Sequence, residues 1–197
     1  MCEFLNDLFA FVMETCELYK IDESHGLGHS MNVYYYATQL YRNTPKMRDK
    51  DEMIICVASI LHDMCDKKYM KEEEGLERVS NFLKRFPVYV SDEEIYIICM
   101  IISTMSYSKV KEMGFPNLGE YMTAYHIVRE ADLLAAYQFD RCVIYQMMKK
   151  GDNYLDSVKY AKDLFDKRVT KHIDHHLFTL EYSKKLVNDM IISYPNF

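Results

Sequence analysis

Apolar residues recur at helical spacing along most of the chain. In the first segment they would line one side of a helix, at positions 4, 5, 8, 11, 12, 16 and 19. The same spacing predicts further helices over residues 28–41, 49–64, 71–85, 91–104, 120–136, 153–171 and 175–193. The helix near residue 120 either ends near 136 or continues towards Met148. The pattern therefore predicts an all-α fold.

Short polar motifs mark where several of these helices begin and end. Ser91 with Glu94 three residues later is a capping box, which predicts a helix start, and Gly151 predicts a helix end. The β-branched run over residues 95–104 would also suit a strand, but no second strand lies nearby to pair with it. Residues 106–119 form the longest irregular stretch, and a loop of that length is more often functional than idle.

The composition is that of an ordinary globular protein. Of the 197 residues, 49% are hydrophobic and 27% are charged, which is enough apolar material for a sizeable core. Only 6 glycines and 4 prolines are present, which argues against a sandwich or barrel of many hairpins. No linker divides the chain, so we expect a single domain over residues 1–197.

The net charge and the cysteine pattern limit which partners the protein can bind and in which cellular compartment we expect it. A net charge of −6 argues against binding a nucleic acid polymer through its phosphates. The six cysteines form no C-x-x-C pair, and the N-terminal segment does not have the features of a signal peptide. The longest apolar run, residues 95–102, is too short to span a bilayer. We expect a cytoplasmic protein without membrane contact, and the sequence leaves a homodimer open.

The strongest local candidate for chemistry is the sequence Leu61-His62-Asp63, near the end of the most apolar predicted helix. Burying a histidine beside an aspartate is unfavourable unless a partner satisfies both, and a divalent cation would do so. The alternative is a neutral histidine bonded to nearby carbonyls. Two further residues favour the metal: His29, at the start of the second predicted helix, and Asp132, on an otherwise apolar face of the sixth.

Together these segments resemble the motifs of the HD-domain metal-dependent phosphohydrolase superfamily. The matching motifs are Gly28-His29-Ser30, Leu61-His62-Asp63-Met64-Cys65-Asp66 and Arg129-Glu130-Ala131-Asp132. The resemblance covers about residues 22–145 and implies a helical bundle of the HD-domain type, with C-terminal helices 153–193 packed on that core. It implies one divalent metal held by His29, His62, Asp63 and Asp132. Mn, Fe, Co, Ni and Zn suit such ligands, and Mg suits them less well.

The resemblance also implies an activity. Two-metal members of the superfamily carry further histidines between the His-Asp pair and the last aspartate, and here only His126 lies in that interval, too near Asp132 to match them. A single cation would stabilise charge on phosphoryl oxygens and lower the pKa of its bound water. The implied activity is hydrolysis of a phosphoester or phosphoanhydride bond in a nucleotide or similar small phosphate compound.

Residues near the motifs receive roles from the same resemblance. Asp66, one helical turn after His62, would orient or deprotonate the attacking water, unless it is only a solvated helix-end acid. Lys67 would contact the phosphate and assist catalysis, with Lys68 as a less favoured substitute. A nearer subset of the superfamily has a Ser-His pair before the first metal histidine, and Ser24-His25 matches it, so His25 would contact the substrate unless it is only a surface-loop histidine.

That subset also has a serine-rich turn after the fifth helix, sometimes with a histidine. This chain has no histidine there, so either Ser106, Ser108 or Lys109 supplies that phosphate contact or the contact is absent. Arg141 would either reach back to the substrate or form a surface ion pair.

Two alternatives come from other classes of protein. One is a non-catalytic regulatory domain that binds metal and nucleotide, and the position of Asp66 discriminates it from an enzyme. The other is a helical interaction module in which the histidines and aspartates are coincidental, and it predicts no bound metal. A last cluster, His172, His175 and His176, is interpreted as a solvated turn and helix start rather than a metal site.

Overall fold

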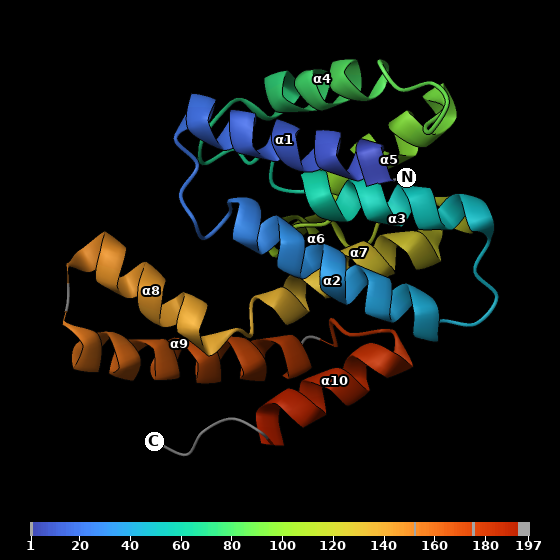
Figure 1. Cartoon of the computed structure of the whole chain (residues 1–197). Helices are drawn as coiled ribbons and strands as arrows, with labels where there is room; N and C mark the ends of the chain where they lie inside the picture. Colours follow the sequence, from blue (N-terminus) through green and yellow to red (C-terminus); the bar gives the residue numbers. More distant parts are fainter. Residues whose placement is uncertain (1, 152, 175, 193–197) are drawn as a thin grey trace.

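The computed structural model describes residues 2–151, 153–174 and 176–192, and its regular structure within these ranges is entirely helical (Figure 1). The predicted all-α fold is therefore confirmed for the described part of the chain. The elements in chain order are α1 (Cys2–Tyr19), α2 (Leu27–Asn43), α3 (Asp49–Leu61), α4 (Glu72–Leu83), α5 (Asp92–Thr104), α6 (Tyr107–Met113), the 3-10 helix η1 (Gly119–Tyr121), α7 (Met122–Ala135), α8 (Phe139–Lys150), α9 (Tyr154–Asp174) and α10 (Glu181–Ile192).

Helix α3 lies at the centre of the bundle. Every residue from Ile54 to Leu61 is buried, as the nearly all-apolar sequence of this segment predicts. Helices α1, α2, α5 and α7 all pack against it, and α2 also packs along α7 (Figure 1). The central position of α3 brings the residues at its C-terminal end close to both α2 and α7.

Two of the predicted helix boundaries are confirmed in detail. The Ser91 hydroxyl accepts a hydrogen bond from the Glu94 amide at 3.3 Å, and the Glu94 carboxylate accepts one from the Ser91 amide at 2.8 Å. This reciprocal pair is a capping box at the start of α5. Gly151 ends α8 with a φ of 68°, a left-handed conformation that a residue without a side chain adopts at low cost.

Three other expectations are corrected. Helix α3 ends at Leu61 rather than near residue 64, and the chain then turns through bonds such as that from the Met64 amide to the Leu61 carbonyl, 3.0 Å. The segment 106–119 is not wholly irregular, because it contains α6. The last helix begins at Glu181, later than the predicted 175.

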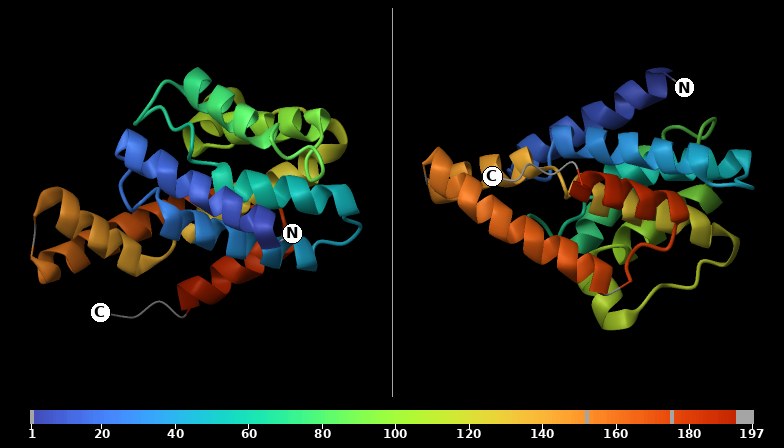
Figure 2. Two further views of the ribbon diagram at one scale, coloured as in Figure 1. Left: turned by 45° about the horizontal axis from the view of Figure 1, so that its top comes forward. Right: turned by 90° about the horizontal axis from the view of Figure 1, so that it is seen from below.

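The open question about the sixth predicted helix is settled. Helix α7 ends at Ala135 and α8 begins at Phe139, so the helix does not continue towards Met148. The break lets α8 fold against α9 and form a helical hairpin that projects to one side of the bundle (Figures 1 and 2). Phe165 of α9 joins the main core, where its ring lies 5.7 Å from that of Tyr137. None of the described helices is both long and apolar enough to cross a membrane.

A buried ion pair joins α7 to the segment before α10. Arg129 and Glu130 are 2% and 0% exposed, and the guanidinium donates to the Glu130 carboxylate at 2.9 Å. That carboxylate also accepts from the Thr179 amide at 2.8 Å, from the Thr179 hydroxyl at 2.7 Å and from the Leu180 amide at 3.2 Å. The Arg129 guanidinium donates in turn to the Leu177 carbonyl. Both charges are thus paired and hydrogen-bonded, as burial requires.

Candidate metal centre

Three helices bring four polar side chains together at the end of the bundle nearest the α8–α9 hairpin. His29 lies in the first turn of α2, His62 and Asp63 directly follow α3, and Asp132 lies on α7. Because α2, α3 and α7 pack on one another, these positions meet although they are far apart in the sequence. The four residues predicted as metal ligands are thus neighbours in space.

The ligand atoms lie within a few ångströms of one another. The two imidazole Nε2 atoms of His29 and His62 are 3.0 Å apart. Asp63 Oδ2 lies 3.4 Å from His29 Nε2 and 3.2 Å from His62 Nε2. Asp132 Oδ1 lies 3.2 Å and 3.7 Å from the same two nitrogens. Both histidines are buried, and the two aspartates are partly exposed. The four groups therefore face a common centre.

The tautomer of His62 follows from its other ring nitrogen. His62 Nδ1 lies 2.9 Å from the Ser59 carbonyl oxygen. A carbonyl can only accept, so Nδ1 must donate, and in the neutral ring Nε2 then carries a lone pair. That lone pair faces Asp63 Oδ2, which is buried and has no hydrogen-bond partner among the described residues. Two acceptors facing each other repel unless a positive charge lies between them.

The pKa values of the two histidines and two aspartates are shifted by their burial and by one another. Burial opposes it, but the carboxylates of Asp63 and Asp132 raise the pKa of His62 to about 9. Burial lowers the pKa of His29, against the hydrogen bond to Asp132. Burial acts to raise the pKa of each aspartate, but the two histidines outweigh it and hold both pKa values below the usual range. A divalent cation would supply the charge without protonating an imidazole.

The donor set fits a first-row divalent cation. Two imidazole nitrogens and two carboxylate oxygens are the ligand types that such ions prefer, and His62 has its second nitrogen fixed by a backbone carbonyl, as metal-binding histidines commonly do. The unpartnered buried Asp63 Oδ2 is the atom that a cation would satisfy. Among the described residues, His29, His62 and Asp63 form a group whose ligand atoms all lie within 4.8 Å of one another, and Asp132 is not part of that group.

Asp66 and the two following lysines lie on the turn after α3. His62 and Asp66 are not one turn apart on a helix, as expected, because α3 ends at Leu61. The non-helical segment that follows α3 nevertheless brings both residues to the lining of one cavity. The Asp66 carboxylate accepts from the Lys68 amide at 2.8 Å, and Lys68 Nζ lies 3.5 Å from it. Lys67 is exposed and lines the same cavity.

A glycine sets the position of this turn. Gly75 of α4 packs so closely on the turn that a Cβ atom there would lie 2.6 Å from the Cα atom of Cys65. Such a distance is shorter than any real Cβ contact, so only glycine allows α4 to approach. The close approach holds the backbone just before Asp66.

His25 is held by a network of polar groups. Its Nε2 lies 3.0 Å from Lys68 Nζ, and its Nδ1 lies 2.7 Å from the Ser24 hydroxyl and 3.3 Å from the Tyr69 hydroxyl. An ammonium only donates, so His25 Nε2 accepts and the ring is neutral in this arrangement. Tyr69 donates to Asp22 at 2.7 Å, which ties this turn to the loop before α2.

Of the remaining residues predicted to contact the substrate, two line the cavities near Asp66 and one has a side chain that is not described. Ser106 lines the cavities on both sides of Asp66. Lys109 lines one of them, but its ammonium is bound by the Glu72 carboxylate and donates to the Ser103 carbonyl at 2.6 Å. Arg141 lies on α8, and its side chain lies outside the part of the chain that is described. Lys68, predicted as a less favoured substitute for Lys67, is the lysine that contacts His25, and Asp22 and Tyr69 join the same network although no motif marks them.

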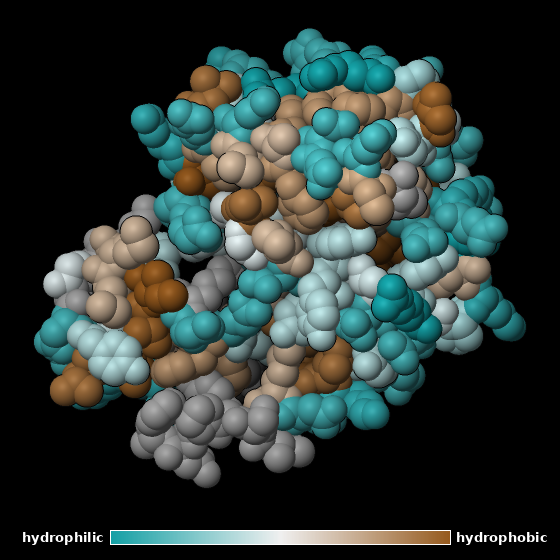
Figure 3. Space-filling model, viewed as in Figure 1, coloured by the Kyte–Doolittle hydropathy of each residue, from teal (hydrophilic) through white to brown (hydrophobic). Residues whose placement is uncertain are grey.

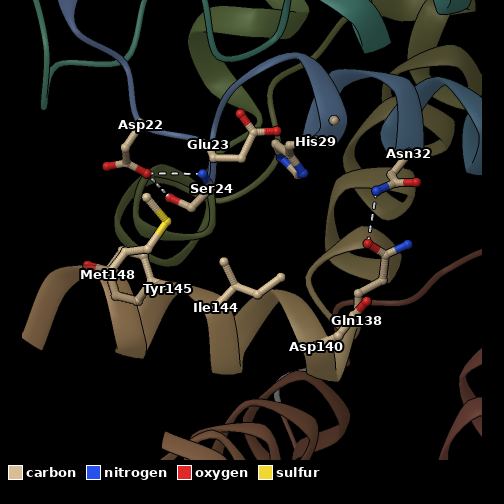
Figure 4. Close-up of a pocket in the computed structure, with 11 residues that line it drawn as sticks. Asp22, Glu23, Ser24, His29, Asn32, Gln138, Asp140, Ile144, Tyr145 and Met148 are labelled. Atoms are coloured by element: carbon tan, nitrogen blue, oxygen red, sulfur yellow. Dashed lines mark hydrogen bonds between the residues drawn. The ribbon is translucent and has the colours of Figure 1, made fainter. Parts of the chain in front are cut away.

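Three adjoining cavities surround the four candidate ligands. The central cavity, of about 460 Å³, is lined by His25, His29, Asp63, Asp66 and Asp132 among others. The lysine cavity, of about 310 Å³, continues past Asp66 and is lined by Lys67, Lys68 and Lys109. The amide cavity, of about 340 Å³, lies on the other side of His29 between α2 and α8, and Asn32 and Gln138 are part of its lining (Figure 4).

His126 faces away from this centre. Its ring packs edge-on against Phe115, with 4.9 Å between ring centroids, and its Nδ1 lies 3.3 Å from the Arg129 guanidinium. Because a guanidinium only donates, His126 accepts and is neutral in this packing. Burial and the Arg129 charge lower the pKa of His126 to about 4.

The depressed pKa of His126 predicts a loss of stability in acid. Between pH 6.5, the ordinary pKa of histidine, and about 4, the unfolded chain binds a proton at this residue and the folded chain does not. The free energy of unfolding therefore falls as the pH drops through this window, by at most about 1.4 kcal/mol per pH unit from this residue. Urea unfolding of the wild type and of His126→Gln at several pH values measures the difference. Equal pH dependence of the two proteins would contradict the prediction.

Of the last histidine cluster, only His176 can be described with its side chain, and it is exposed with a φ of 49°. His175 and the side chain of His172 lie outside the described residues.

Comparison with protein-family models found no match, and neither curated proteins nor solved structures gave one. The described residues form an all-helical bundle with a group that could hold a metal ion, His29, His62 and Asp63, and the Asp132 carboxylate lies 3.2 Å from His29.

Proposed function

We propose that the protein is a metal-dependent phosphohydrolase with a helical bundle of the HD-domain type. It would cleave a phosphoester or phosphoanhydride bond of a nucleotide or a similar small phosphate compound. The observation that carries the proposal is the convergence of His29, His62, Asp63 and Asp132, with the inter-residue distances given above of 3.0 to 3.7 Å. The centre opens into cavities that also hold a carboxylate and several cationic side chains.

The four converging residues would hold one divalent cation. When bound, the cation would stabilise negative charge on phosphoryl oxygens and lower the pKa of a water in its coordination sphere. The residues of the chain complete the chemistry around it. Burial of both imidazoles and the fixed tautomer of His62 keep their nitrogens directed at the centre.

Asp66 is suited to accept the proton of the attacking water. Its carboxylate is partly buried and lines both the central and the lysine cavity, next to Asp63. The Lys68 amide, at 2.8 Å, fixes the orientation of one carboxylate oxygen. A general base held within reach of the reacting groups typically contributes about 10²–10⁴-fold to the rate.

Lys68 and His25 are placed to bind the phosphate. Lys68 Nζ bridges His25 and Asp66, so a phosphate that enters the central cavity meets an ammonium already positioned there. Lys67 lies on the lysine-cavity side and would add a second positive charge. The Ser106 hydroxyl lines both cavities and can donate to a phosphate oxygen.

The proposal is tested with the purified chain and a series of metals. Bound metal is measured after loading with Mn, Fe, Co, Ni, Zn or Mg, and each form is assayed against nucleotides and simple phosphate esters. We expect one equivalent of metal and release of phosphate or pyrophosphate, and we expect Asp66→Asn to keep the metal but lose about 10²–10⁴-fold of the turnover.

The other outcomes separate the alternatives. Absence of stoichiometric metal with all six ions would remove the proposal and favour a helical interaction module. Metal and nucleotide binding without turnover in the wild type would instead support the non-catalytic regulatory domain.

A further inference from the structure

The amide cavity differs in character from the two cavities that it adjoins. It shares Ser24, His29 and Tyr145 with the central cavity, so a molecule at the candidate metal centre can extend into it. Figure 4 shows Ile144, Tyr145 and Met148 of α8 on one side, facing the loop before α2 and the first turns of that helix. The cavity is therefore a direct extension of the proposed active site.

Charge makes this cavity unsuitable for a phosphate. Asp22, Glu23 and Asp140 line it, and its described lining contains no lysine or arginine. A phosphate placed there would meet three carboxylates and no cation. The lysine cavity on the opposite side does hold cations, because Lys67, Lys68 and Lys109 line it together with the carboxylates of Asp63, Asp66, Glu72 and Asp132. The two sides of the metal centre thus favour opposite ends of a substrate.

Hydrogen-bonding groups make the amide cavity equally unsuitable for a plain alkyl chain. Asn32 Nδ2 donates to Gln138 Oε1 at 2.9 Å, which joins α2 to the residue before α8 (Figure 4). Both amides line the cavity, where an amide oxygen can accept and an amide NH₂ can donate a hydrogen bond, and Gln138 also bonds to the Tyr36 hydroxyl. An alkyl occupant would desolvate these groups without replacing their bonds to water, at a cost of about 1–3 kcal/mol for each unsatisfied group.

The remaining wall is apolar and belongs to α8. Ile144 and Met148 are 50% and 73% exposed, and the Tyr145 ring is 39% exposed. Figure 3 shows apolar side chains gathered on the projecting hairpin, with a hollow between it and the rest of the molecule. An aromatic ring beside aliphatic side chains suits the flat face of a heterocycle, whose edge can then bond to amides and carboxylates.

We infer that the amide cavity binds the nucleoside part of the substrate, with the base against Ile144, Tyr145 and Met148 and its polar edge towards Asn32 and Gln138. The inference rests on the proposed function for the position of the phosphate, which would lie on the side of Lys67 and Lys68. The substrate would then span His29, with its base and its phosphate on opposite sides of the metal centre. The ligand class is a nucleoside phosphate rather than a sugar phosphate or a lipid phosphate.

Nucleosides test the inference because they carry no phosphate, so their binding reports on the cavity alone. The dissociation constants of adenosine, guanosine, cytidine and thymidine are measured with the full chain by saturation-transfer NMR. We expect at least one nucleoside to bind, and Ile144→Glu to weaken it by about tenfold or more, because a fourth carboxylate would stand where the base lies. The matched control is Met147→Glu, on the same helix, 39% exposed and outside the cavity lining, which should bind as the wild type does.

A second variant keeps the test independent of the charge change. Asn32→Leu removes the amide and retains a side chain of similar size, and it should weaken the same nucleoside while circular dichroism shows unchanged helix content. Equal affinities in Ile144→Glu and Met147→Glu would overturn the inference. So would a wild type that hydrolyses simple phosphate esters but binds no nucleoside, and that result would leave the proposed function intact. Nucleoside binding without metal or hydrolysis would uphold the cavity assignment and remove the proposed function.

Discussion

Replacing Asp63 by alanine is expected to abolish both metal binding and hydrolysis. Asp63 Oδ2 lies 3.4 and 3.2 Å from the two imidazole Nε2 atoms and is buried without a hydrogen-bond partner among the described residues. Loss of groups that only orient a ligand commonly costs 10- to 100-fold in metal affinity, so loss of the ligand itself should cost more than about 100-fold. Metal content after dialysis and the rate of phosphate release measure the two effects.

The neighbouring acid provides the matched control. Asp66→Ala removes a carboxylate three residues later on the same turn, and it should retain the metal because Asp66 is not one of the converging ligands. Asp63→Asn keeps the shape of the side chain and tests whether its charge is needed. An Asp63→Ala protein that keeps one equivalent of metal, or full activity, would show that the centre does not work as proposed.

Replacing Glu130 by alanine should cause the largest loss of stability of any substitution considered. The Glu130 carboxylate is fully buried, pairs with Arg129 at 2.9 Å and accepts three hydrogen bonds from Thr179 and Leu180. Its removal leaves the buried guanidinium without its counter-charge and detaches the segment before α10. Breaking one partner of such a pair costs about 3–5 kcal/mol, which urea unfolding measures.

Two controls separate the ion pair from other effects. Glu130→Gln retains an acceptor oxygen and the side-chain volume, so it should lose less stability than the alanine variant. Glu181→Ala removes a glutamate whose pair with Lys184 is exposed, and it should change the free energy of unfolding little. Similar losses in Glu130→Ala and Glu181→Ala would contradict a structural role for the buried pair.

The helices and the four candidate ligands could be predicted from the sequence for a physical reason. Helical periodicity and a capping box such as that of Ser91 depend on neighbouring residues, so the sequence carries them directly. His62 and Asp63 end an apolar helix, and Asp132 lies on an otherwise apolar helix face. Their grouping with His29 came from the resemblance of these motifs to those of the HD-domain superfamily, and the structure brings the four side chains close together.

The turn after α3 could not be predicted in the same way. Its path depends on the approach of α4 at Gly75, a contact between segments that no local pattern encodes. On this turn, Lys68 rather than Lys67 reaches His25. The burial of Arg129 and Glu130 was equally invisible, because charged helix residues usually face solvent and only the distant segment around Thr179 encloses them.

The break between α7 and α8 places the candidate metal ligand of α7 and the cavity-lining residues of α8 on separate helices. Asp132 stays on α7 with the other candidate ligands, whereas Ile144, Tyr145 and Met148 lie on a hairpin packed mainly on itself. Substitutions on the exposed face of α8 can therefore reshape the adjoining cavity without moving the two histidines and two aspartates. On the proposed function, such substitutions would change which ligand the amide cavity accepts and leave the proposed metal centre in place.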